Sequence, residues 1–173
     1  MGFEDSVFIN CPFDDEYHHI LRPILFTAIY LGLKPRIALE RSDSGEPRIS
    51  KIIELIKASK YAIHDLSRLR ANEAGEYFRL NMPFELGIDV GCRTFGSNAL
   101  GDKRCLILEA AKYRYQAALS DLSGSDIAVH AMSRSRLPPK CATGWPRNVV
   151  QRQLVQQKCG VPSTISWRGI TTP

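Results

Sequence analysis

The sequence predicts an α/β fold in which helices cover both faces of a parallel sheet. Short runs of β-branched and aromatic residues alternate along the chain with segments whose apolar residues recur at helical spacing. Parallel strands need crossover connections, and these place helices on the faces of the sheet. We therefore expect a flavodoxin-like or Rossmann-like three-layer sandwich with strand order 2-1-3-4 and an optional fifth strand after it.

The individual elements follow from local patterns. Pro12 lacks a backbone donor and ends the first strand, and Pro23 is expected to kink the first helix or to begin its second half. The segment from Arg48 is strongly amphipathic, and Gly91 marks the end of the last clear helix. We expect strands at residues 6–10, 36–39, 61–66 and 105–108, helices at residues 14–32, 48–59 and 83–91, and a helix or turn at 113–119.

Charge and periodicity divide the chain into two parts. Residues 1–130 form the predicted α/β domain, and residues 131–173 lose helical and strand periodicity and suggest an irregular or disordered tail. Residues 127–173 hold seven Lys and Arg and no acid, which leaves the preceding 126 residues with a net charge of −2 within a total of +5. A shifted reading frame would also produce such an abrupt change in composition.

Composition excludes several functional classes. No stretch approaches the roughly 20 apolar residues that cross a bilayer, and no signal peptide is evident, so we expect a cytoplasmic protein without a membrane partner. The balanced charge of the folded part argues against nucleic acid as a partner. The five cysteines and four histidines show no C-x-x-C or zinc-type spacing, so we expect neither a disulfide framework nor a metal.

Three polar residues follow predicted strands or open the next helix. Asn10 and Asp65 end strands that should be neighbours, and Glu85 lies near the start of a helix at the same edge, where such sheets bind ligands. The positive helix end should keep Glu85 ionised. Each residue has a simpler interpretation: Asp65 as a loop cap, Asn10 as a turn residue and Glu85 as an exposed side chain.

Three segments carry a family resemblance. Phe8–Phe13, Ala62–Ser67 and Asn81–Gly87 resemble the landmarks of the nucleoside 2-deoxyribosyltransferase superfamily: a strand ending in Gly-Pro-Phe, a strand ending in Asp, and a helix opening with Glu-Leu-Gly. The wider group is similar to bacterial Toll/interleukin-receptor-like (TIR-like) domains, some of which cleave NAD and act in anti-phage defence. Asn10 and Cys11 replace the small pair before Pro-Phe, and the loop from Ser67 is longer and more charged than in the transferases.

The resemblance implies N-glycosidic chemistry on a nucleotide or on NAD, bound as substrate or ligand and not as a resident cofactor. Glu85 would attack or stabilise the anomeric carbon, and Asp65 would orient the sugar hydroxyls or assist the leaving base. Arg48 is placed to meet a phosphate. The matching positions that would bind substrate are Asn10, Pro12, Phe13, Asn81 and Met82.

The sequence is also compatible with two other functions. A nucleotide sensor that changes its self-association and a TIR-like interaction domain are both compatible with the fold.

Cys11 is a candidate nucleophile or a packed apolar residue, and His64 should face away from Asp65 in a packing role. The segment Tyr113–Tyr115 could stack on a nucleotide or belong to a surface helix.

Overall fold

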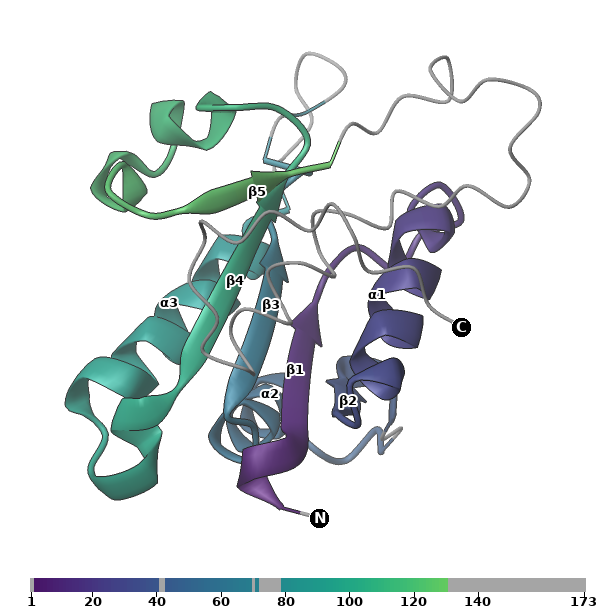
Figure 1. Ribbon diagram of the computed structural model, residues 1–173, viewed down its shortest axis with the longest axis vertical. Coiled ribbons are helices and arrows are strands. Elements are labelled where there is room, and N and C mark those ends of the chain that lie inside the picture. Colours follow the sequence, from purple (N-terminus) through teal and green to yellow (C-terminus); the bar gives the residue numbers. More distant parts are fainter. Residues whose placement is uncertain (1, 41–42, 70, 72–78, 131–173) are drawn as a thin grey trace, which may run out of the picture.

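A computed structural model describes residues 2–40, 43–69, 71 and 79–130 of the protein, and its strands form one parallel sheet. The strand order is β2-β1-β3-β4-β5, which confirms the predicted α/β fold class (Figure 1). The strands are β1 (Ser6–Asn10), β2 (Lys34–Ile37), β3 (Tyr61–Asp65), β4 (Arg104–Glu109) and β5 (Ile127–Val129). The predicted tail at residues 131–173 lies outside the described residues.

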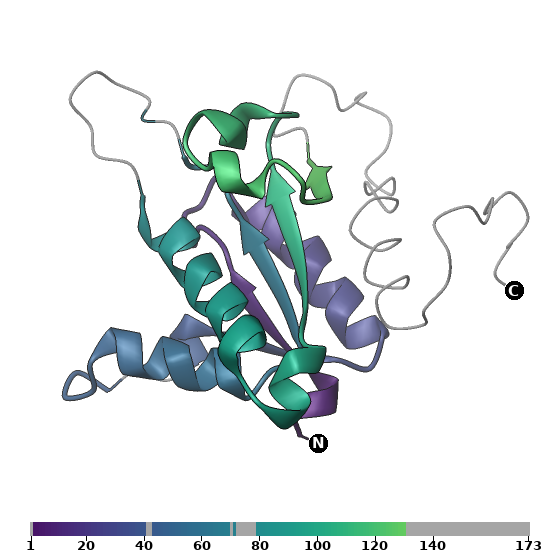
Figure 2. The ribbon, with the colours of Figure 1, turned by 90° about the vertical axis from the view of Figure 1, so that its left-hand side faces the viewer.

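Helices cover both faces of the sheet (Figure 2). The α-helices are α1 (His18–Tyr30), α2 (Arg48–Lys57) and α3 (Asn81–Phe95). Short 3-10 helices join the elements: η1 (Phe3–Asp5), η2 (Ala38–Glu40), η3 (Asn98–Asp102), η4 (Arg114–Ala117) and η5 (Ser120–Leu122). Within the described part of the chain, no helix is both long enough and apolar enough to traverse a bilayer.

The central strand β3 sends successive side chains to opposite faces of the sheet. Ile63 packs in the core beneath α1, whereas Ala62 packs in the core beneath α2. The two polar residues at its end divide in the same way: His64 bonds to a residue of α3, and Asp65 bonds to Tyr17 just before α1. This alternation gives the sheet edge two separate polar clusters, one on each face.

The first helix differs from its predicted bounds. It begins at His18, because the carboxylate of Asp14 accepts a hydrogen bond from the Tyr17 N–H at 3.0 Å and holds the preceding residues in a turn. The helix continues through Pro23 to Tyr30 without a second start. The acidic residues that suggested an earlier helix start therefore serve this turn.

The second strand lies two residues before its predicted start. It spans Lys34–Ile37 and is followed directly by η2, so that Arg36 donates to the carboxylate of Glu40 at 2.8 Å. The segment at 113–119 forms the short η4. The optional fifth strand exists as β5, which pairs with β4 over only three residues.

Helix α3 is longer than the sequence pattern predicted. It passes through Gly87 and Gly91 and ends before Gly96, whose N–H donates to the Cys92 carbonyl at 3.0 Å. A Cβ at position 96 would lie 2.2 Å from that carbonyl oxygen, so this helix end accepts no larger residue. Gly96, rather than Gly91, is the glycine that ends the helix.

We expect Ile63→Ala to lower the free energy of unfolding by about 2–5 kcal/mol, because Ile63 is fully buried in the central strand. Urea denaturation followed by circular dichroism measures this change. Ile29→Ala is the matched control, since Ile29 is 64% exposed on α1 and its truncation should cost less than about 0.5 kcal/mol. Equal losses for the two variants would contradict the described packing.

Candidate active site

Asp65 lies at the carboxyl end of β3 and is fully buried. Its Oδ2 accepts a hydrogen bond from the Tyr17 hydroxyl at 2.5 Å and lies 2.6 Å from His130 Nε2, while its Oδ1 accepts from the Ser67 N–H at 2.7 Å. Burial alone would raise the pKa of Asp65, but the hydrogen bonds from His130, Ser67 and Tyr17 outweigh burial and lower the pKa. Asp65 is therefore a buried carboxylate that keeps its negative charge.

The partners of Asp65 include two residues that sequence reasoning missed. The bond to Ser67 is the loop cap that the simpler interpretation of Asp65 predicted. Tyr17 and His130, however, lie 48 and 65 residues away in the sequence and carry no motif that links them to Asp65. The optional fifth strand was predicted without a residue range, so His130, which follows β5, was not assigned to this edge.

Glu85 lies in the second turn of α3 and is 5% exposed. No hydrogen-bond partner reaches its carboxyl group from the residues that the structure describes. Burial raises the pKa of Glu85 from its ordinary value of 4.5 to about 7, against the lowering effect of the Arg48 charge. The predictions that Glu85 is fully ionised or exposed are therefore wrong, because the loss of hydration outweighs the favourable charge around it.

The Cys11 thiol is influenced by the charges of both Asp65 and Glu85. The thiol is buried in the core that faces α1, and burial raises its pKa far above the ordinary value. The charges of Asp65, Asp14 and Glu85 raise it further. Because the thiol stays protonated, the structure favours the packed interpretation of Cys11 over the nucleophile.

A buried hydrogen-bond chain lies on the other face of the sheet. The Asn10 Nδ2 group donates to the Met82 carbonyl at 2.9 Å and contacts His64 Nδ1 at 3.0 Å. Since a carbonyl only accepts, Nδ2 is the donor to both partners, and His64 Nδ1 acts as an acceptor. His64 Nε2 then carries the hydrogen and donates to Asp89 Oδ2 at 3.1 Å. His64 thus faces away from Asp65, as the strand alternation predicts.

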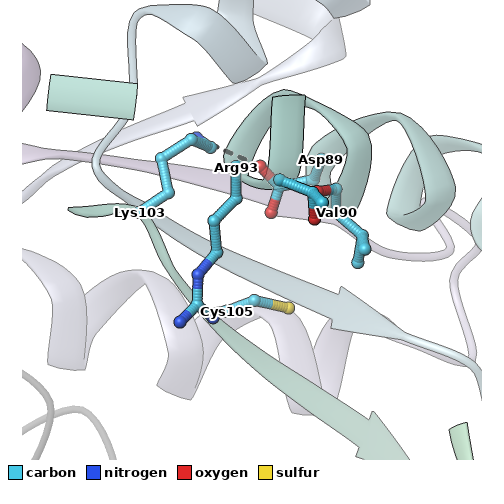
Figure 3. A pocket seen from close by; sticks show the side chains of 6 residues that line it. Asp89, Val90, Arg93, Lys103 and Cys105 are labelled. Carbon is cyan, nitrogen blue, oxygen red and sulfur yellow. Dashed lines mark hydrogen bonds and ion pairs between the residues drawn. The ribbon is translucent and has the colours of Figure 1, made fainter. Parts of the chain in front are cut away.

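Lys103 completes this chain with a positive charge. Its ammonium lies 3.0 Å from Asp89 Oδ1 (Figure 3). It also donates to the carbonyls of Ile56, at 2.7 Å, and Ser59. Burial would raise the pKa of Asp89, but the hydrogen bond from His64 and the charge of Lys103 lower it. The chain therefore balances one buried carboxylate with one buried ammonium.

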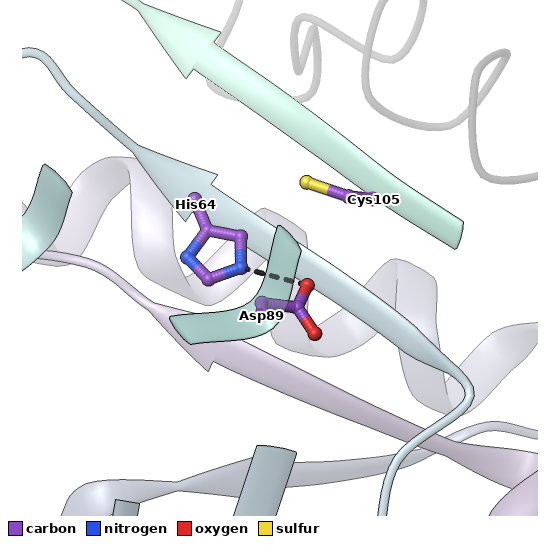
Figure 4. Close-up of side chains that lie close together, drawn as sticks. All are labelled: His64, Asp89 and Cys105. Carbon is purple, nitrogen blue, oxygen red and sulfur yellow. Dashed lines mark hydrogen bonds and ion pairs between the residues drawn. The ribbon is translucent and has the colours of Figure 1, made fainter. Parts of the chain in front are cut away.

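The hydrogen-bond chain also includes side chains whose types and spacing resemble those of a metal site. His64, Asp89 and Cys105 offer three ligand atoms that lie within 4.8 Å of one another (Figure 4). The Lys103 ammonium already neutralises Asp89, and burial together with the Asp89 charge raises the pKa of Cys105 to about 12. A protonated thiol and a resident ammonium do not suit a divalent cation, so we interpret this group as a structural network.

A pocket opens beside this network and is distinct from the sheet edge that holds Asp65. It lies at the amino end of β4, where Lys103 precedes the strand, on the side of α3 (Figure 3). Its lining residues are Asp89, Val90, Arg93, Thr94, Lys103 and Cys105. None of the sequence-predicted site residues belongs to this set.

The remaining predicted site residues divide between core and surface. Pro12 is buried and Phe13 packs against the core beneath α1. Met82 is a core residue whose carbonyl holds Asn10, whereas Asn81 beside it is exposed. Arg48 is exposed at the start of α2, and its charge acts on Glu85. Asn10 is 2% exposed and ends β1, so it is a buried hydrogen-bonding residue rather than an exposed turn residue.

The segment 113–115 does not form a stacking surface. Arg114 binds the buried carboxylate of Glu109, with 2.9 Å between Nε and Oε2. Tyr115 is buried against α3, and only Tyr113 is exposed. Arg114 and Tyr115 therefore support the end of β4 instead of facing a ligand.

The fold and the site define an α/β protein with a polar cluster at the carboxyl edge of a parallel sheet. Comparison with models of known protein families finds no match, and comparison with curated proteins finds none either. The resemblance carried by the three sequence motifs therefore stays a prediction. What the structure adds is the opposite direction of the pKa shifts of two carboxyl groups, Asp65 and Glu85.

We expect Lys103→Met to lower the free energy of unfolding by about 3–5 kcal/mol, because it leaves the buried Asp89 charge without its cation. Adding Asp89→Asn should recover part of this loss, since it removes the uncompensated charge. Denaturant unfolding of the wild type, both single variants and the double variant measures the coupling between the two residues. Strictly additive losses would show that the ion pair does not stabilise the network.

Glu85 should make the stability of the protein depend on pH. Between about pH 4.5 and pH 7 the unfolded chain loses the Glu85 proton while the folded protein keeps it, so folding becomes less favourable as the pH rises. Glu85→Gln removes this cost. We expect the free-energy advantage of the variant over the wild type to grow by up to about 3 kcal/mol between pH 4.5 and pH 8.

Urea unfolding of the two proteins at both pH values measures this difference, and other titrating groups cancel in the comparison. An advantage that stays constant with pH would mean that Glu85 titrates near its ordinary value and is not a buried acid.

Proposed function

We propose that the protein is an N-glycosidase or glycosyltransferase that acts on a nucleotide or on NAD, with Glu85 at the anomeric carbon. The observation that carries this proposal is a buried carboxyl group without a hydrogen-bond partner among the described residues, near the carboxyl edge of a parallel sheet. Ligands of open α/β sheets bind at this edge, and carboxyl groups with shifted pKa values cluster at functional sites.

The chemistry suits a carboxylate in a dry environment. As the bond between the anomeric carbon and the base breaks, its electron pair leaves with the base and positive charge develops on the sugar. The Glu85 carboxylate stabilises this charge or forms a bond to the carbon. A carboxylate held out of water interacts more strongly with the developing charge than an exposed one does.

Asp65 supports a different role from that of Glu85. Its lowered pKa and three hydrogen bonds hold a permanent negative charge in one orientation. A fixed acceptor of this kind orients the hydroxyl groups of a sugar but is poorly suited to exchange protons. Arg48 is exposed on α2 and its charge acts on Glu85, and in this proposal it binds a phosphate of the same ligand.

A nucleotide sensor is the second candidate. The raised pKa of Glu85 leaves about half of the carboxyl groups protonated near neutral pH, and a protonated carboxyl donates a hydrogen bond to a ribose oxygen. In such a protein nucleotide binding would change self-association without turnover, in a TIR-like role that includes anti-phage defence. The two candidates differ in what Glu85→Gln removes: turnover in the enzyme and affinity in the sensor.

We expect the wild-type protein to release free base from at least one member of a panel of NAD, NADP, nucleotides and deoxynucleosides. The rate should rise with pH through about 7 as Glu85 loses its proton. Glu85→Gln should lower the rate by at least about 100-fold and keep binding. Chromatography of the reaction mixture measures released base, and ligand-dependent thermal stabilisation measures binding.

Glu54→Gln is the matched control, because Glu54 is an exposed glutamate on α2 away from the sheet edge. It should release base at the wild-type rate. Thermal stabilisation of the wild type by a panel member without any base release, lost in Glu85→Gln, would favour the sensor over the enzyme.

A further inference from the structure

His130 is held at the carboxyl edge by contacts to three elements. Its backbone N–H donates to the backbone carbonyl of Glu109, at the end of β4, at 2.9 Å. Its ring Nε2 lies 2.6 Å from Asp65 Oδ2, at the end of β3. Its ring meets the Tyr17 ring edge to face, with 6.1 Å between centroids. Since Asp65 keeps its charge, Nε2 carries a hydrogen and donates it.

The other ring nitrogen of His130, Nδ1, makes no hydrogen bond with any residue that the structure describes. This atom is buried, although the side chain as a whole remains 13% exposed. The Ser67 hydroxyl, on the residue whose N–H binds the other oxygen of Asp65, is also buried without a partner in the described part of the chain. Buried polar atoms are normally paired, so two unpaired ones around one carboxylate indicate that this edge binds a further polar molecule.

We propose that His130 is the general base that activates the attacking water in the reaction proposed above, with Asp65 as its orienting partner. This inference rests on the proposed function and adds a second reactive residue to it. The arrangement has the parts that a base needs: a nitrogen lone pair at Nδ1, and a carboxylate that fixes the ring and stabilises the imidazolium formed.

The proposed hydrolysis proceeds in two steps. In the first step the bond between the anomeric carbon and the base breaks, its electron pair leaves with the base, and the Glu85 oxygen bonds to the carbon. In the second step a water oxygen attacks the carbon, its proton passes to His130 Nδ1, and the bond to Glu85 breaks with its electron pair returned to the carboxylate. His130 then releases the proton to solvent. No other reactant is needed.

The surroundings of His130 fit this role. Asp65 faces the ring from β3, and Tyr17 faces it from the segment before α1, with the Asp14 carboxylate acting on Tyr17. Burial and the Asp65 charge raise the pKa of Tyr17 well above its ordinary value, so the phenol stays neutral. A positive charge that forms on the imidazole during proton transfer therefore meets one anion and one neutral hydroxyl on these two sides.

His130→Gln tests the proposal, because the glutamine amide keeps a donor for Asp65 and lacks the basic nitrogen. Wild type and variant are incubated with NAD and radiolabelled nicotinamide, or with whichever panel member the wild type cleaves and its labelled base. Hydrolysis is followed as net base release, and base exchange as label incorporated into the nucleotide. Exchange uses the Glu85 intermediate but no activated water.

We expect His130→Gln to lower hydrolysis by about 10²–10⁴-fold and to retain base exchange. Added azide, which needs no deprotonation, should form a glycosyl azide with the variant. Tyr17→Phe removes the other side-chain donor to the same Asp65 oxygen, and it should leave the wild-type ratio of hydrolysis to exchange unchanged.

Three results would overturn the proposal. An unchanged ratio of hydrolysis to exchange in His130→Gln would show that His130 does not activate water, while the role of Glu85 would stand. A change in the ratio as large in Tyr17→Phe as in His130→Gln would assign it to the general arrangement around Asp65. If the wild type releases no base from any panel member, the proposed function and the role of His130 are both wrong.

Discussion

The cost of taking carboxyl groups out of water determines how this sheet is assembled. Four of them, Asp65, Glu85, Asp89 and Glu109, are buried in or beside the parallel sheet, although an unpaired buried charge is too costly for a domain of ordinary stability. Three of the four have donors built around them from distant parts of the chain: Tyr17 and His130 for Asp65, His64 and Lys103 for Asp89, and Arg114 for Glu109. These contacts connect β3, β4, β5 and the helices on both faces, so the polar groups specify the same topology as the apolar core.

The two-residue alternation of β3 keeps two of these systems apart. His64 and Asp65 are consecutive, yet each belongs to a network on its own side of the sheet. In each network a different set of groups stabilises the buried carboxylate. Lys103 gives the α3 side a permanent cation, and this closed system explains why His64, Asp89 and Cys105 resemble a metal site without suiting one. On the α1 side, the residues that the structure describes place no such cation next to Asp65, and they leave His130 Nδ1 and the Ser67 hydroxyl unpaired.

The architecture was predictable from the sequence because strand and helix patterns are local. The strand order followed from the alternation of elements, and the position of Asn10, Asp65 and Glu85 at one edge followed from the direction of parallel strands. Strand β5 was less predictable, since three residues are too few to show a period of two. Tyr17 and His130 were missed because their bonds to Asp65 depend on how distant segments pack, and the ionisation of Glu85 was misjudged because a sequence shows the helix start but not the depth of burial.

Asp65 and Glu85 lie in opposite electrostatic environments, and together they support the proposed function more strongly than either residue does alone. Donors around Asp65 hold it ionised in one orientation, whereas Glu85 has no donor among the described residues and titrates near neutral pH. When the surroundings push two carboxyl groups apart in pKa, the fixed charge suits orientation and the labile group suits reaction. A structural explanation accounts for Asp65, because its bonds join β3, β5 and the segment before α1. It does not account for Glu85, which is buried at a cost and stabilises nothing that the described residues show, and this difference supports the proposal that Glu85 reacts with a partially positive group.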